Sequence, residues 1–377
     1  MLRVVTPKEG HIEYLLGKRW YYLVPFDIPS WYPEVTDSTG VYRIYDPALG
    51  WTLGKLGQDP PLYYSNRQGY RCSKTQFLAA QQSRETSEID SVDVIAIGDS
   101  FTHGDEVLFE EAWPYQLQLT TGWTVLNLGV GGYGIDQATL HYEQTVVKSK
   151  VVLLGLVAGD MERSRRLIYN FTRGGLKTKP LFSFNGKQTR IINQPAIFGG
   201  DLRREFMKGE ESSFFGQDLT YTSPLYLKRE IFDGSYLYRV LKSFVVWRQE
   251  RKTPIYRTDD ERLAYCLKII GHLRDSAEER GARLVVVLLG NNNTFADRWQ
   301  RDIENPWELM ETKLTERSIP YVNTADKLYP YFANNPDTVI NSFGVHYTPF
   351  ANEKVASILQ HTEILRHIMT RSSNNAE

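Results

Sequence analysis

Five short apolar segments, separated by segments with helical spacing, constrain the fold of this chain more than any other feature. The apolar segments are rich in β-branched residues and span 92–97, 124–128, 151–157, 283–289 and 320–323. The helical patterns cover 113–120, 133–148, 259–280, 307–317 and 348–371. Continuously apolar strands that alternate with helices are typical of a parallel sheet covered on both faces. The sequence therefore predicts a three-layer α/β/α fold.

Two aromatic-rich regions interrupt this alternation. Aromatic residues make up 13% of the chain and gather in the first 75 residues and between 181 and 247. We predict an N-terminal extension over 1–90 that packs on the core, and a domain over 91–371 with a large insertion at about 163–255. Such aromatic segments pack as satellite layers or line a groove for a sugar, and composition alone leaves both interpretations open.

Charge and hydropathy exclude several classes of protein. The chain has 44 Lys and Arg against 45 Asp and Glu, so it lacks the basic excess of a nucleic-acid-binding surface. Its longest apolar runs stop at about eight residues, far below the roughly 20 that a membrane span needs. The first 20 residues carry charges where a signal peptide would be apolar. We therefore expect a soluble chain without a membrane span, cytoplasmic by default, although the compartment is unknown.

Neither a metal site nor a disulfide framework is expected. The two cysteines, Cys72 and Cys266, are too few for either, and two buried thiols are the simpler interpretation. We expect no metal and no organic cofactor.

The residues that follow the strands are the candidates for chemistry, because ligands of open α/β sheets bind beyond the carboxyl ends of the strands. The first strand is followed by Gly98, Asp99 and Ser100. At the start of a helix, the Ser100 N–H would point outward and the helix dipole would favour a developing negative charge, which suits a nucleophile. The alternative is that Asp99 or Ser100 only caps the helix.

Two further segments belong with this serine. A glycine-rich loop, 127–134, follows the second strand and would let backbone N–H groups approach a ligand. Taken alone it could be a flexible turn or a phosphate loop, but its spacing is not that of a dinucleotide-binding motif. His346 precedes the last helix and could reach Ser100 across the same sheet edge. A lone histidine is more often structural, so the case for a catalytic role of His346 depends on Ser100 and the glycine-rich loop.

Taken together, these motifs resemble those of the SGNH (GDSL-type) hydrolases, over roughly residues 91–370 with the insertion outside. The resemblance implies their flavodoxin-like α/β/α fold, and it implies that Ser100 is the nucleophile. It further implies that the N–H groups of Ser100 and Gly132 stabilise the oxyanion and that His346 is the general base. No metal or cofactor is implied.

The chain departs from that family at two positions. Gly159 stands where the family has an oxyanion-binding asparagine, although Asp160 matches the aspartate that follows it. Removing one oxyanion donor costs on the order of 10²–10³ in rate. The aspartate expected two or three residues before His346 is also missing, since those positions are Gly344 and Phe343.

Several residues could compensate for these departures. A backbone carbonyl could orient His346 in a Ser–His dyad, whereas Asp337 is a less favoured orienting group. Arg163 could stabilise the oxyanion or bind an acidic group of the substrate, or it could form only a surface ion pair with Asp160. His103 could act as an alternative base, although stacking beside the site is the favoured interpretation.

The expected function is a serine esterase that acts on a small or carbohydrate-linked ester through an acyl-enzyme. Asp99, Gly159, Asp160 and Arg163 are expected to be accessory or substrate-binding residues. The alternatives are an O-acyltransferase that acts on a sugar hydroxyl and a degenerate, non-catalytic member that binds a glycan or a protein.

Overall fold

The computed structural model describes most of the chain, in two compact units. The described residues are 3–4, 12–14, 40–82, 89–169, 177–186, 188–219, 230–235, 237–238, 241–242, 245 and 254–374. One unit comprises 1–36, 45–51 and 165–253, and the other comprises 37–44, 52–164 and 254–377. The division predicted from the sequence, with a boundary near residue 90, stays a prediction.

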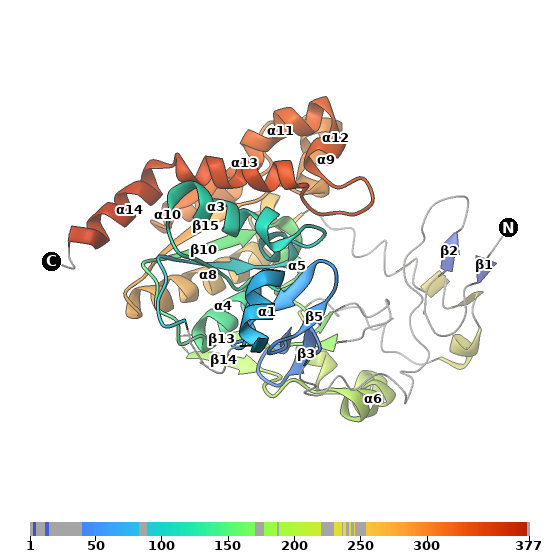
Figure 1. Ribbon diagram of the computed structural model, residues 1–377. Coiled ribbons are helices and arrows are strands. Elements are labelled where there is room, and N and C mark those ends of the chain that lie inside the picture. Colours follow the sequence, from blue (N-terminus) through green and yellow to red (C-terminus); the bar gives the residue numbers. More distant parts are fainter. Residues whose placement is uncertain are drawn as a thin grey trace. The chain divides into compact units, whose positions relative to one another are not determined.

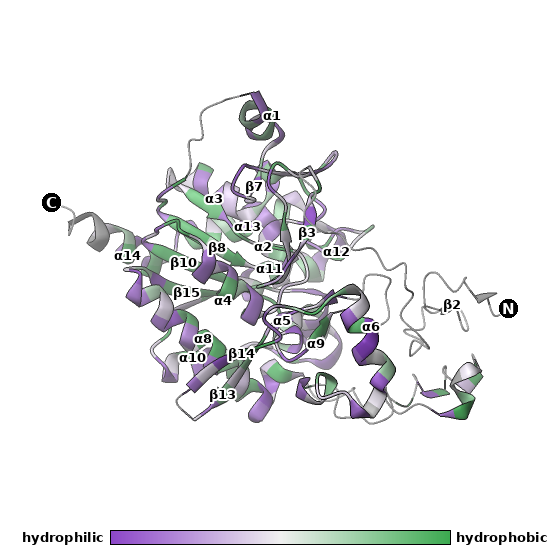
Figure 2. Ribbon diagram, turned by 90° about the horizontal axis from the view of Figure 1, so that it is seen from below, coloured by the Kyte–Doolittle hydropathy of each residue, from purple (hydrophilic) through white to green (hydrophobic). Residues whose placement is uncertain are grey.

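The second unit contains a five-stranded sheet in the order β16-β15-β10-β8-β9, with every neighbouring pair parallel. Its strands are β8 (Val94–Gly98), β9 (Val125–Asn127), β10 (Val151–Leu156), β15 (Arg283–Leu288) and β16 (Tyr321–Asn323). The central strands β8 and β10 are buried along their whole length and hydrophobic, as Figure 2 shows. All five predicted strands are confirmed, and the two central ones have no polar face.

Helices cover both faces of this sheet. On one face, α13 (Pro349–Gln360) packs against α3 (Trp113–Thr121) and α11 (Thr324–Asn334). On the other face, α4 (Ile135–Gln144) packs against α8 (Glu261–Glu279) (Figure 1). Capping residues fix where α8 and α13 begin. The Asp260 carboxylate accepts hydrogen bonds from N–H groups in the first turn of α8, and Pro349 follows Thr348, which caps α13. The predicted three-layer α/β/α fold is confirmed.

The last predicted helix is two helices. After α13 the chain breaks at His361 and Thr362, and α14 (Glu363–Asn374) follows. At the break, the Thr362 hydroxyl donates to the Ile358 carbonyl and His361 Nδ1 bonds the Ser357 carbonyl. These side chains satisfy the carbonyls at the end of α13, which ends the helix where the periodicity alone would continue it.

The second unit also contains shorter elements. They are β5 (Gln58–Asp59), β6 (Tyr63–Ser65), β7 (Arg71–Cys72), α1 (Lys74–Gln82), α2 (Ser100–His103), η1 (Phe109–Glu111), α5 (Ala158–Arg163), η5 (Ile255–Arg257), α9 (Asn292–Arg301), α10 (Glu308–Glu316) and α12 (Pro336–Val339). Two of them, α2 and α5, begin directly after β8 and β10. They therefore place their first residues at the edge where a ligand of such a sheet binds.

The first unit consists of short strands and helical turns. Its strands are β1 (Arg3–Val4), β2 (Ile12–Tyr14), β11 (Ile168–Tyr169), β12 (Lys177–Thr178), β13 (Leu181–Asn185) and β14 (Gln188–Ile192), and its helices are α6 (Gly199–Lys208), η2 (Gly209–Glu211), η3 (Phe215–Gln217) and η4 (Ile231–Gly234). β3 (Arg43–Asp46) and β4 (Gly50–Leu53) contain residues of both units. Nowhere in the described part of the chain is a helix both long and apolar enough to cross a membrane.

Candidate active site

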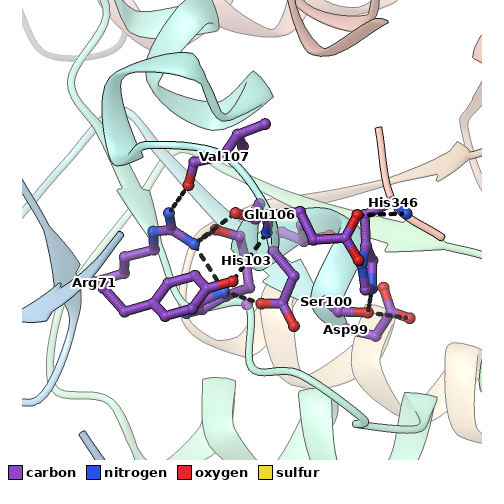
Figure 3. A network of polar contacts seen from close by, with 12 residues as sticks. Arg71, Asp99, Ser100, His103, Glu106, Val107 and His346 are labelled. Carbon is purple, nitrogen blue, oxygen red and sulfur yellow. Dashed lines mark hydrogen bonds and ion pairs between the residues drawn. The ribbon is translucent and has the colours of Figure 1, made fainter. Parts of the chain in front are cut away.

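Ser100 and His346 are in direct contact at the carboxyl edge of the sheet. Ser100 is the first residue of α2, and the Asp99 carboxylate caps this helix by accepting the Phe101 N–H at 2.9 Å. His346 lies in the loop before α13, and its Nε2 is 2.8 Å from the Ser100 Oγ (Figure 3). The two residues are 246 positions apart in the chain, so the sheet brings them together.

The other ring nitrogen of His346 contacts a carboxylate. Its Nδ1 is 2.7 Å from the Oε1 of Glu106, in the loop between α2 and η1. The Glu106 carboxylate also accepts the N–H groups of Val345 at 3.2 Å and of His346 at 3.3 Å. Glu106 therefore orients His346, in place of the backbone carbonyl that the sequence left possible and of the less favoured Asp337.

Position 344, where an aspartate was expected, has no room for a side chain. A Cβ atom at position 344 would overlap the Glu106 carboxylate, so only glycine leaves the carboxylate its place. A carboxylate does stand beside His346, but it comes from position 106 instead of from the histidine's own loop. The resulting line of Ser100, His346 and Glu106 has the contacts of a nucleophile, a base and an orienting acid.

The backbone of Glu106 is held in an uncommon conformation. Its φ is +72°, a left-handed value that non-glycine residues rarely adopt. The Glu106 N–H donates to the Tyr63 hydroxyl at 2.9 Å, and Tyr63 belongs to β6. Because strain of this kind persists only where the surroundings enforce it, Tyr63 and the His346 loop together fix the carboxylate.

His103 is buried and hydrogen-bonded at both ring nitrogens, so it is not the general base for Ser100. Its side chain is fully buried, its Nδ1 lies 2.5 Å from Asp105, and its Nε2 lies 2.6 Å from the Tyr42 hydroxyl. Arg71 lies against the same ring and donates to the His103 and Gly104 carbonyls at 2.6 and 2.8 Å. Burial, and then the charge of Arg71, lower the pKa of His103 to about 4. His103 is thus a neutral structural group at the end of α2.

The two expected backbone donors lie on α2 and on the loop after β9, and these two segments are hydrogen-bonded to each other. The Asn127 side chain donates to the Thr102 carbonyl at 2.9 Å and accepts the Gly129 N–H at 2.9 Å, which fixes the loop after β9 against α2. Gly132 lies further along that loop, with φ of +84°. Among the described residues, none accepts a hydrogen bond from the N–H of Ser100 or of Gly132. Both groups can therefore donate to a ligand.

Asp99, Asp160 and Arg163 form a buried ionic cluster beside Ser100. Arg163 Nη2 lies 2.5 Å from Asp99 Oδ2 and also contacts Asp160 Oδ1, while Arg163 Nε donates to the Tyr133 carbonyl at 2.8 Å. Burial and the charge of Asp99 raise the pKa of Asp160 well above its usual range. The contact of Arg163 with Asp160 is therefore more than a surface ion pair, because the same guanidinium bridges two buried carboxylates.

Gly159, where the resemblance to the SGNH hydrolases led us to expect asparagine, lies in the first turn of α5 beside this guanidinium. A Cβ atom at position 159 would lie 3.3 Å from Arg163 Nη1. At Gly344 the space of a side chain is taken by a carboxylate from another part of the chain, whereas at Gly159 the neighbouring group is Arg163, which belongs to the same helix.

Sequence reasoning missed Glu106 because nothing local marks it as a partner of a histidine 240 residues away. Two signals pointed toward it: an acidic pair, Asp105 and Glu106, directly after the α2 segment, and a glycine at position 344.

Comparisons with known proteins gave matches among solved structures only. No protein-family model and no curated protein matches the chain. A member of the lipolytic G-D-S-L family from Veillonella parvula DSM 2008 is 11% identical, with a TM-score of 0.39, and the match covers 72% of this chain and 98% of that one. An acetyl xylan esterase from Butyrivibrio proteoclasticus is 10% identical, with a TM-score of 0.30, over 77% of this chain and 66% of that one. Likeness this distant carries no argument about activity, so function depends on the geometry above.

Proposed function

We propose that this chain is a serine esterase that hydrolyses a small or carbohydrate-linked acyl ester through an acyl-enzyme. The observation that carries the proposal is the continuous line of contacts from Ser100 Oγ to His346 Nε2, at 2.8 Å, and from His346 Nδ1 to Glu106, at 2.7 Å. A general base must lie within hydrogen-bond reach of the proton that it takes. This geometry favours catalysis over the alternative of a degenerate binding protein.

The contacts of Ser100, His346 and Glu106 define how protons move during the proposed reaction. With its Nδ1–H donated to Glu106, His346 presents the lone pair of Nε2 to the Ser100 hydroxyl. As Oγ attacks the ester carbonyl carbon, the hydroxyl proton moves to Nε2 and the carbonyl oxygen becomes an oxyanion facing the N–H groups of Ser100 and Gly132. His346 then protonates the leaving alcohol. A water molecule, activated by the same nitrogen, releases the acid and restores Ser100.

A cavity beside His346 supports a substrate with a hydroxylated leaving group. It has a volume of about 560 Å³ and borders His346 and Glu106. Its lining also includes aromatic rings and side chains that donate or accept hydrogen bonds, namely Tyr42, Arg43, Gln58, Asp59 and Tyr63. Cavities of this size hold ligands of one or two sugar rings, and aromatic faces with polar neighbours suit a sugar.

Hydrolysis of p-nitrophenyl acetate and butyrate tests the proposal. Wild type, Ser100→Ala and the control Ser91→Ala, an exposed serine, are compared between pH 6 and 9. We expect turnover in wild type and in the control, and none above background in Ser100→Ala. Equal background rates in all three proteins would contradict esterase action on activated esters. Acyl transfer to an added sugar that exceeds hydrolysis would favour the acyltransferase alternative.

A further inference from the structure

We propose that Arg71 is a positioning residue for the Glu106 carboxylate. Its buried guanidinium holds the backbone on both sides of Glu106, so that the carboxylate meets His346 in the orientation that the reaction needs. The inference rests on the proposed esterase function and extends it, from the three residues in contact to the group that holds one of them.

One guanidinium bonds the backbone before and after Glu106. Arg71 Nη1 donates to the carbonyls of His103 and Gly104 at 2.6 and 2.8 Å, and Nη2 donates to the Val107 carbonyl at 2.8 Å. Figure 3 shows the side chain reaching both places from β7, the strand that contains Arg71. Because these carbonyls flank position 106, their spacing sets where the Glu106 side chain starts.

The backbone of Glu106 needs such support. Its φ of +72° is a left-handed value, which a non-glycine residue keeps only where the surroundings enforce it. The Tyr63 hydroxyl accepts the Glu106 N–H at 2.9 Å, and the Arg71 guanidinium lies 5.2 Å from the centre of the Tyr63 ring. Arg71 therefore acts on Glu106 in two ways, through the flanking carbonyls and through the tyrosine that bonds its N–H.

Burial separates Arg71 from any direct role in the reaction. The residue is only 2% exposed, so it does not contact a substrate. A buried cation is costly unless its N–H groups are hydrogen-bonded. Here they meet the backbone carbonyls of the segment that carries Glu106, and Nη1 also lies 2.8 Å from His103 Nδ1. Arg71 can thus affect catalysis only through the groups that it holds.

The competing explanation is that Arg71 only stabilises the fold. Arg280 offers a matched control, because its guanidinium also joins three backbone carbonyls and lies over a tyrosine ring. It donates to the carbonyls of Tyr142, Thr145 and Val147 at 2.6, 2.5 and 3.3 Å, and its Cζ lies 4.5 Å from the centre of the Tyr142 ring. These residues precede β10, at the opposite edge of the sheet from the candidate active site.

Lysine and glutamine variants separate the two roles. Arg71→Lys keeps the charge, but its ammonium is a single point and cannot bond the backbone on both sides of Glu106. Arg71→Gln removes the charge as well. The controls are Arg280→Lys and Arg280→Gln. The readouts are kcat and KM for p-nitrophenyl acetate, with urea unfolding to report the folded state.

We expect Arg71→Lys to lower kcat on the order of 10–10²-fold with a smaller change in KM, because a misplacement of about 1 Å can cost about 10²-fold. Arg280→Lys should keep the wild-type kcat even where it loses similar stability. In a Glu106→Gln background, Arg71→Lys should lower kcat by about twofold at most, because the contact that it supports is already lost.

Proton NMR reports the same effect without turnover. The proton between His346 Nδ1 and the Glu106 carboxylate should give a far-downfield signal, identified by its absence in Glu106→Gln. We expect this signal to be shifted or lost in Arg71→Lys and unchanged in Arg280→Lys.

Wild-type kcat in Arg71→Lys would overturn the inference, as would equal losses of kcat in Arg71→Lys with and without Glu106→Gln. Unfolding of both Arg71 variants under the assay conditions would also overturn it, because Arg71 would then be a residue that supports the fold. Absence of Ser100-dependent turnover in the wild type would instead refute the proposed function, while the NMR signal would still test whether Arg71 positions Glu106.

Discussion

The carboxylate of Glu106 occupies the space that a side chain at Gly344 would fill. The acid that orients His346 is therefore supplied from the loop after the nucleophile's helix, 240 residues from the histidine. At Gly159 the group nearest to an added Cβ atom is the Arg163 guanidinium of the same helix, at 3.3 Å. The carboxylate expected beside His346 is thus supplied from another segment of the chain.

Glu106→Gln tests the role of the carboxylate. The amide keeps nearly the same size but cannot stabilise the imidazolium that forms when His346 takes the serine proton. We expect kcat for p-nitrophenyl acetate to fall roughly 10²–10⁴-fold with little change in KM. Glu110→Gln, four residues along the same segment, is the matched control and should retain the wild-type kcat. Equal losses in both variants would argue against a specific role for Glu106.

Gly344→Asp tests the shared space directly. An aspartate there would collide with the Glu106 carboxylate and add a like charge, so we expect the free energy of unfolding to fall by about 1–3 kcal/mol. Combining Gly344→Asp with Glu106→Ala removes the collision and moves the acid into the histidine's own loop. The double variant should exceed Glu106→Ala in both stability and kcat. A double variant no better than the sum of its two single variants would show that the positions do not share one space.

Tyr63→Phe tests how Glu106 is held. The variant removes the oxygen that accepts the Glu106 N–H while keeping the ring. A part-buried N–H without a partner costs about 1–3 kcal/mol, and the φ of +72° loses its support. We expect kcat to fall roughly tenfold, since 1.4 kcal/mol corresponds to a factor of ten. Tyr115→Phe is the control. Unchanged kcat in Tyr63→Phe would mean that the His346 loop alone positions Glu106.

The buried His103 predicts a loss of stability in mild acid. Its pKa is about 4 in the folded chain and near 6.5 when unfolded, because burial and Arg71 disfavour the charged ring. Between these values the unfolded chain binds more protons at this histidine, so the contribution of His103 to the free energy of unfolding falls as pH falls from about 6.5 to 4. The lowered pKa of Asp105 acts only below about pH 4, outside this window.

Urea unfolding at pH 7.5 and pH 5.0 measures this effect. The difference between the two pH values should shrink in His103→Gln and stay at its wild-type size in His367→Gln, which changes an exposed histidine. The same pH difference in wild type and His103→Gln would show that His103 is not the group responsible.

Local patterns predicted the parts of the structure that local physics determines. The five strands follow from continuous apolar runs, whereas the roles expected of Ser100 and His346 came from the resemblance of their motifs to those of the SGNH hydrolases. The polar helices α9 and α12 lack a comparable apolar pattern and were not predicted. Glu106 and the bridging contacts of Arg163 depend on long-range packing, which no window of the sequence contains. The only signals in the sequence were the unexpected glycines: Gly344 faces the Glu106 carboxylate, and Gly159 faces the Arg163 guanidinium.

Labelling with a fluorophosphonate tests the central claim most directly, because the reagent reacts with an activated serine and leaves a covalent mass. Intact-protein and peptide mass spectrometry should show one adduct per chain, on Ser100, with none in Ser100→Ala and a much slower rate in Glu106→Gln. An adduct on another residue, or equal rates in wild type and Glu106→Gln, would contradict a nucleophile activated through His346 and Glu106.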